Sequence, residues 1–185
     1  MTLTFGSQAE PYGLAWGLHR PSNNWFVSTP REHTISNGVG FGLNKWGVDA
    51  ALFYGGNEVD ADAHWATRVS YGVTLAGLDS KFGLSLNSDE AQLVDVSVSS
   101  GIFETSLEYD LSEEADGAYW ARGVITPGTS GAFLLIGLNS DEVVTYGVGY
   151  KCSDNMKVVS EFTSGKDSDG NDIENDFAIR ASYSF

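Results

Sequence analysis

Apolar and polar residues alternate along most of this chain with a period of two. In the segment from 65 to 75, odd-numbered positions are mostly aromatic or aliphatic, and even-numbered positions carry mainly arginine, serine, glycine and threonine. The segments 103–111 and 144–151 alternate in the same way. Successive side chains of an extended strand point to opposite faces, whereas helical spacing fits none of these segments. The pattern therefore predicts two-faced β-strands.

The same alternation predicts about twelve strands over the whole chain, each long enough to cross a membrane at a tilt. They fall near residues 2–7, 35–44, 46–55, 64–76, 80–87, 92–99, 102–111, 117–126, 130–138, 143–151, 155–163 and 175–185. Short connections, centred on Lys45, Asp79, Gly101, residues 127–131 and residues 153–155, alternate with longer ones. Such alternation is typical of a transmembrane β-barrel. We expect an all-β antiparallel barrel that forms a single domain over residues 1–185.

Alternation alone fits two architectures, a soluble sheet with its apolar face inward and a barrel with its apolar face in lipid. Two further features favour the barrel. The polar face carries many charged residues, which a water-filled interior tolerates. Aromatic residues also lie toward the predicted strand ends, where they suit a membrane interface. These aromatic residues are Trp46, Tyr54, Trp65, Tyr109, Tyr119 and Tyr150.

Charge and composition exclude several classes of protein. The chain has 10 Lys and Arg against 25 Asp and Glu, a net charge of −15, which argues against nucleic-acid binding. The single cysteine, Cys152, cannot form an internal disulfide. The longest apolar run, near residues 131–138, is far shorter than the roughly 20 residues of a membrane helix. The chain starts directly with an alternating segment, so we expect its export signal to lie outside this sequence.

The last predicted strand ends in an aromatic residue. One of its sides is apolar and contains Phe177, Ile179, Tyr183 and Phe185. This ending resembles the C-terminal signature of bacterial outer-membrane barrels. The resemblance implies that these four residues form the recognition signal for the barrel-assembly machinery.

A second resemblance lies near the start of the chain. A strand-like segment ends at Gln8, a long connection over residues 8–34 follows, and Ser36-Asn37-Gly38-Val39 opens the next strand. This order resembles the part of trimeric general porins in which a strand leads into the long third loop. The resemblance implies a constriction loop at residues 8–34 and a homotrimer in the outer membrane of a Gram-negative bacterium, in contact with the lipid bilayer and lipopolysaccharide.

Two relations to that family stay open at this point. The chain is either a complete barrel, with residues 2–7 paired against residues 177–185, or a sixteen-stranded porin without its first four strands. Glycines at positions 38, 40 and 42 stand where porins often place an arginine, which weakens the expectation of a strong transverse field.

In a pore, selectivity comes from the charge and width of the narrowest section. In the inserted loop the candidate residues are Glu10, Arg20, Arg31 and Glu32. On the wall they are Asp49, Arg68, Glu104, Glu108, Arg122 and Arg180. Each of them could equally be a solvated wall group without a selective role. Because acids outnumber bases, we expect a mild cation preference.

Catalytic, metal-binding and cofactor-binding motifs are missing from the sequence. His19, His33 and His64 fall in or beside loops, and neither a nucleophile elbow nor a phosphate-binding loop is present. Residues 167–172 are rich in oxygen ligands, but their glycine does not fit an EF-hand. We therefore expect no enzymatic activity, metal or cofactor.

The function that the sequence favours is passive diffusion of small polar solutes and ions through an outer-membrane porin. Two alternatives stay open. One is a secreted or surface all-β binding or adhesion module with acidic loops, which would be soluble without detergent. The other is an outer-membrane barrel enzyme that hydrolyses lipids, which would need a serine and a histidine together on the lipid face.

Overall fold

The computed structural model describes residues 1–14, 35–56, 63–112, 117–166 and 172–183, and its regular structure consists of twelve β-strands. The strands are β1 (Thr2–Ala9), β2 (Ile35–Lys45), β3 (Val48–Gly56), β4 (Ala63–Leu75), β5 (Leu78–Asn87), β6 (Gln92–Ser99), β7 (Phe103–Asp110), β8 (Tyr119–Ile125), β9 (Ala132–Asn139), β10 (Val144–Ser153), β11 (Met156–Lys166) and β12 (Asp172–Tyr183). The prediction of an all-β chain with about twelve strands is confirmed. Within the described ranges, we find no helix with the length and apolar character needed to traverse a bilayer.

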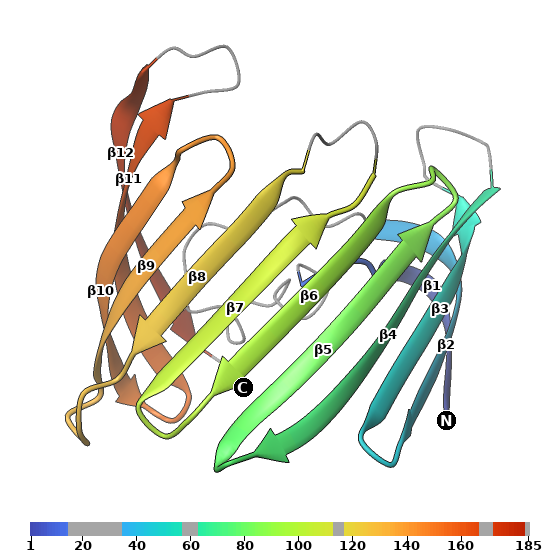
Figure 1. Cartoon of the computed structure of the whole chain (residues 1–185), viewed down its shortest axis with the longest axis horizontal. Helices are drawn as coiled ribbons and strands as arrows, with labels where there is room; N and C mark the ends of the chain where they lie inside the picture. The colour runs from blue at the N-terminus through green and yellow to red at the C-terminus, as the bar shows by residue number, and fades with distance from the viewer. Residues whose placement is uncertain (15–34, 57–62, 113–116, 167–171, 184–185) are drawn as a thin grey trace.

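All twelve strands belong to one sheet, in which each strand pairs antiparallel with the next one along the chain. The strands are tilted, and the sheet curves so that its two end strands turn back behind the middle ones (Figure 1). Tight turns join β2 to β3, β4 to β5, β6 to β7 and β10 to β11 at the lower end of the view (Figure 1).

The sheet is open between its first and last strands. In the described residues β1 pairs only with β2, and β12 pairs only with β11. The expected pairing of residues 2–7 with residues 177–185 is therefore not found. Each neighbouring pair is formed by strands that follow one another along the chain, whereas closure would depend on the summed twist and curvature of all twelve strands.

Two of the tight turns have the same backbone geometry. Trp46 and Gly47 have φ angles of 55° and 81°, and Ala76 and Gly77 have 51° and 81°. Two successive residues with positive φ are the signature of a type I′ hairpin turn, whose twist matches that of the strands. The predicted turn centre at Asp79 is wrong, because Asp79 lies in β5, paired with Thr74 and Ser99. The glycine at the second position of the turn, Gly77, is the sequence signal that locates this turn.

Two connections at the opposite end repeat the sequence Asn-Ser-Asp-Glu and fold identically. In the first, the Asn87 side-chain oxygen accepts hydrogen bonds from the backbone N–H groups of Asp89 and Ala91, at 3.1 and 3.0 Å. In the second, Asn139 accepts them from Asp141 and Val143 at the same two distances. A side chain that satisfies local backbone donors in this way fixes the turn without help from distant residues.

Candidate functional site

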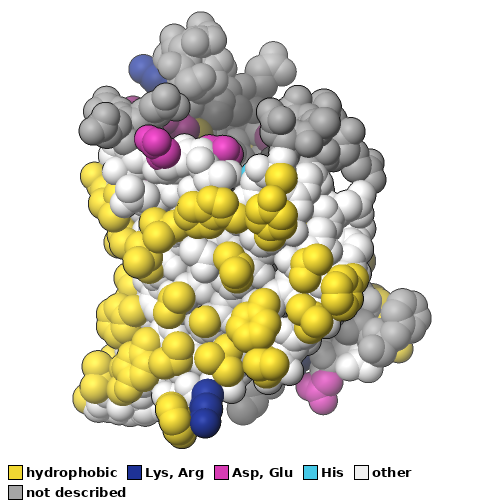
Figure 2. Space-filling view, turned by 90° about the vertical axis from the view of Figure 1, so that its right-hand side faces the viewer, with side chains coloured by type: hydrophobic (Ala, Val, Ile, Leu, Met, Phe, Trp, Pro, Cys, Tyr) yellow, Lys and Arg dark blue, Asp and Glu magenta, His cyan; other side chains and the backbone are white. Residues whose placement is uncertain are grey.

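The two faces of the sheet have the reverse of the usual polarity of a soluble protein. Large apolar side chains on the outward face are exposed, for example Ile136 at 59% and Phe177 at 61%. Figure 2 shows such apolar side chains spread over one side of the molecule. The buried side chains of the described residues are instead mainly polar or charged, among them Arg68, Asp95 and Glu108. Soluble sheets bury their apolar face, so the inward polar wall is the candidate functional surface.

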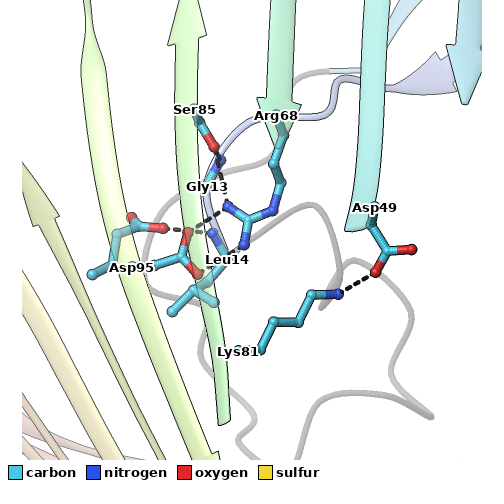
Figure 3. Close-up of polar contacts among 8 residues, drawn as sticks. Gly13, Leu14, Asp49, Arg68, Lys81, Ser85 and Asp95 are labelled. Atoms are coloured by element: carbon cyan, nitrogen blue, oxygen red, sulfur yellow. Dashed lines mark hydrogen bonds and ion pairs between the residues drawn. The ribbon is translucent and has the colours of Figure 1, made fainter. Parts of the chain in front are cut away.

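An ion pair between β4 and β6 lies at the centre of this wall. The Arg68 guanidinium donates to both carboxylate oxygens of Asp95, at 2.5 and 2.8 Å, and to the Ser85 hydroxyl at 3.1 Å (Figure 3). Arg68 pairs in register with Ser85 of β5, and Asp95 pairs with Gly83 of the same strand. A glycine there leaves room for the guanidinium, because a Cβ on Gly83 would lie 2.5 Å from Arg68 Nη2. A buried pair with two parallel hydrogen bonds holds both side chains in a fixed geometry.

The segment that follows β1 crosses the inner face and binds to this wall (Figure 3). The Gly13 N–H donates to the Ser85 hydroxyl at 3.0 Å, and the Leu14 N–H donates to the Glu108 carboxylate at 2.5 Å. Ser85 therefore links the crossing segment to Arg68. The predicted start of the constriction loop at residue 8 is wrong by two positions, because residues 8 and 9 belong to β1. Gly13 and Leu14 of the loop lie against the inner wall, and residues 15–34 are outside the described residues.

Gly13 is required by both its backbone and its surroundings. Its φ angle is +63°, which L-residues with a side chain rarely adopt. A Cβ at this position would lie 2.5 Å from Glu108 Oε2 and 2.8 Å from Leu93 Cδ1. The crossing segment therefore touches β6 and β7 so closely that only a glycine fits.

Glu10 anchors the beginning of the same segment. Its carboxylate accepts a hydrogen bond from the Ser36 hydroxyl at 2.5 Å and contacts His64 Nε2 at 2.5 Å. The His64 ring also lies 5.7 Å from the Phe53 ring, centroid to centroid. Glu10 is only 8% exposed, so the start of β2 and of β4 together bury this carboxylate.

Cavities lie along the described part of the inner wall, and two of them have Asp49 or Lys81 in their lining. The larger, about 800 Å³, lies along β1 to β3 and is lined by Thr2, Thr4, Gln8, Asn44 and Asp49 among others. The smaller, about 460 Å³, lies along β4 to β7 near the tight-turn end and includes Lys81 and Glu104 in its lining. The Lys81 ammonium lies 2.8 Å from the Asp49 carboxylate, so one ion pair joins the two cavities (Figure 3).

The inner wall from β7 to β8 carries a second cationic group. Arg122 lies 3.7 Å from Glu104 and donates through Nε to the Ser106 hydroxyl at 3.0 Å. Its guanidinium carbon is also 5.2 Å from the centre of the Trp120 ring. The Arg122 side chain is thus held on three sides and is almost fully buried.

Farther along the wall, from β8 to β11, a group of apolar residues is buried beside polar ones such as Thr145, Lys157 and Glu161. Val124, Phe133, Leu135 and Val159 form a buried cluster. The ring of Phe133 packs on the backbone of β10, because a Cβ on Gly149 would lie 2.1 Å from Phe133 Cζ. This part of the interior is packed like a small core rather than hollowed.

The structure places seven of the ten predicted pore residues. Glu10 lies on the crossing segment, and Asp49, Arg68, Glu104, Glu108, Arg122 and Arg180 lie on strands of the wall. Arg20, Arg31 and Glu32 lie outside the described residues. Of the predicted assembly signal, Phe177, Ile179 and Tyr183 are exposed, and Phe185 lies outside the described residues. A role in a pore or in assembly stays a prediction for all of these residues.

Sequence reasoning gave no pore role to several residues that organise the wall: Lys81 and Asp95 were expected only as charges of the polar face, and Gly13, His64 and Ser85 were not expected to take part. Alternation does place Lys81, Ser85 and Asp95 on the polar face, but their partners lie on other strands. Ser85 and Gly13, for example, are 72 positions apart. Only the pairing of the strands brings such residues together.

Neither a metal site within the described residues nor a known relative assigns a role to this wall. In the described ranges no three His, Cys, Asp or Glu side chains come together as a possible metal site. Most of the oxygen-rich stretch 167–172 lies outside those ranges. The chain matches no protein-family profile, and no curated protein matches it in sequence.

Proposed function

We propose that this chain forms a closed transmembrane β-barrel of the porin type, through which small polar solutes and ions diffuse passively across a bacterial outer membrane. One observation carries the proposal, the reversed polarity of the sheet. An exposed apolar surface that extends over the outer face of a whole sheet needs a partner, and lipid covers such a surface on all sides. A polar, charged interior with cavities suits water and dissolved solutes.

The dimensions of the strands support the same proposal. They range from 7 residues in β8 to 13 in β4, which brackets the roughly 9–11 residues that a tilted strand needs to cross the hydrocarbon layer. Antiparallel neighbours joined in chain order are also the topology of membrane barrels. A soluble domain with this many exposed apolar side chains would aggregate.

Closure is part of the proposal. Unpaired backbone groups at the free edges of β1 and β12 would each cost several kcal/mol in lipid, roughly as any unsatisfied polar group does there. We propose that these edges are paired in the membrane. We also propose that the outward aromatic residues of β12 are recognised by the assembly machinery. From the resemblance to general porins, we propose that the chain assembles as a trimer in contact with lipopolysaccharide.

The test is to refold the chain in detergent, reconstitute it in planar bilayers and record single-channel currents. We expect discrete conductance steps and a folded form that migrates differently from the heated form in gels. A β-rich monomer that is soluble without detergent and produces no steps would overturn the proposal and favour a binding module.

Two adjacent residues of β6 provide a matched pair of variants. Val96 lies on the outward face between Phe82 and Leu107, whereas Ser97 faces the smaller cavity. Val96→Lys should oppose membrane insertion by about 2–4 kcal/mol, as charges on the lipid face of barrels do. Ser97→Lys adds the same charge to the water-filled side and should insert normally. Equal insertion of the two variants would contradict a lipid-facing outer surface.

A further inference from the structure

The ion pair between Lys81 of β5 and Asp49 of β3 differs from the other strong pair on the wall in its access to water. The Lys81 and Asp49 side chains are 46% and 34% exposed, whereas those of Arg68 and Asp95 are 7% and 1% exposed. A solute on the inner side can therefore reach the first pair and not the second. The pair also links the linings of the two cavities, because Asp49 lines the larger cavity and Lys81 lines the smaller one, and we refer to this place as their junction.

Lys81 faces mostly acidic neighbours. Asp49 binds it directly and also accepts a hydrogen bond from the Asn44 amide. Asp79 and Glu104 line the same cavity as Lys81. Of these carboxylates, Asp79 also accepts a hydrogen bond from the Thr74 hydroxyl, and Glu104 lies near Arg122. Lys81 is thus the accessible positive charge that offsets the carboxylates of this stretch of wall.

The larger cavity carries little other charge. Its lining side chains supply hydroxyl and amide groups from Thr2, Thr4, Gln8 and Asn44, and Asp49 is its charged residue within the described ranges. With Lys81 bound to Asp49, the junction of the two cavities presents a neutral pair. Without Lys81, the Asp49 carboxylate would lose its direct ion-pair partner and would present more negative charge to passing ions.

From these positions we propose that Lys81 is the specificity-determining residue of the passage. It neutralises Asp49 at the junction of the two cavities, and so holds down the cation preference of a strongly acidic chain. Uncharged polar solutes and ions of both signs can then pass the junction. The inference rests on the proposed channel.

Reversal potentials in a salt gradient test it. Lys81→Gln should raise the ratio of cation to anion permeability about fivefold, which is the effect of one unpaired charge near a passing ion in water. Asp49→Asn should shift the ratio in the opposite direction, because Lys81 then loses its direct partner. The double variant should return close to the wild-type ratio, since it removes both charges of the pair.

Lys45→Gln is the matched control. It removes the same charge at the same end of the sheet, but Lys45 lies over the exposed Trp46 ring, at 4.0 Å, and does not line either cavity. We expect its permeability ratio to match that of the wild type. Equal shifts in Lys81→Gln and Lys45→Gln, or no shift in either, would overturn the role of Lys81 while channels still form. Wild-type protein that forms no channels would instead overturn the proposed function.

Discussion

The inner wall of this sheet has two different halves. From β1 to β7 it is mainly polar, although it also buries Phe53 and Leu93, and it carries the crossing segment, the pairs Arg68–Asp95 and Lys81–Asp49 and both cavities. From β8 to β11 it contains the buried apolar cluster of Val124, Phe133, Leu135 and Val159, beside the buried side chains of Arg122, Lys157 and Glu161. Both halves share the same alternation of apolar and polar positions on their outward face.

In the proposed channel, this difference would separate residues that stabilise the fold from residues that contact solutes. Apolar side chains packed against each other on the inside exclude water and contribute to folding, as in any core. Polar side chains with open space beside them contribute less to stability but can contact a solute. We therefore infer that changes in the β8–β11 half alter mainly the free energy of unfolding, and that changes in the β1–β7 half alter mainly conduction.

The largest effect is expected from Phe133→Ala. Removing a ring that is 1% exposed should lower the free energy of unfolding by about 3–5 kcal/mol, because transfer energy is lost and a cavity remains. Urea unfolding of the detergent-folded protein, followed by tryptophan fluorescence, measures it. Single-channel conductance of the folded fraction should stay at the wild-type value. A large change in conductance would show that the apolar half also lines the passage.

Two glycines on the inner face make the next comparison. Gly149→Val in β10 should destabilise the protein by about 1–3 kcal/mol, since the new side chain overlaps the Phe133 ring. Gly42→Val in β2 should change stability by less than about 0.5 kcal/mol, because a Cβ there meets only Thr2 Cβ, at 3.8 Å. The added side chain at Gly42 enters the larger cavity and should lower conductance. If Gly42→Val leaves the conductance unchanged, the passage does not run along β1 to β3.

The crossing segment is tested by Gly13→Ala. A methyl group there collides with Glu108 and Leu93, so the segment should detach from the wall, with a cost of roughly 1–2 kcal/mol and a changed conductance. Gly6→Ala is the control, because Gly6 also has a positive φ, at +97°, but has nothing within 4 Å of its Cβ position. The same conductance change in both variants would mean that backbone strain, rather than the contact with Glu108, is responsible.

Sequence alone could predict the strands because their alternation is local and regular. It could also have placed the tight turns, since Trp46-Gly47 and Ala76-Gly77 carry a glycine where positive φ is needed. The wall was harder to predict. Arg68 and Asp95 are 27 positions apart, and their contact follows from two strand registers and from the small size of Gly83.

The difference between the inner faces of the two halves was as hard to predict from sequence as the contact between Arg68 and Asp95. Val124, Leu135 and Val159 occupy positions that alternation assigns to the polar face, and their apolar character breaks the period there. An apolar residue on the polar face indicates a packed interior only when apolar residues of the neighbouring strands lie next to it. Val124 and Leu135 are register partners on β8 and β9, so the cluster can be recognised only once this strand pairing is known.

Small effects on stability, without any effect on conduction, are expected at the two Asn-Ser-Asp-Glu turns, which place the same local structure in the two halves. Asn87→Ala and Asn139→Ala each remove two side-chain hydrogen bonds to backbone N–H groups, and each should cost about 1 kcal/mol. Because the loss is local, urea unfolding should give equal values for the two variants, and neither should change the reversal potential. A clearly larger cost for Asn139→Ala would mean that the β8–β11 half depends on this turn for the alignment of β9 and β10. The β1–β7 half would then tolerate the loss of the same contacts at Asn87.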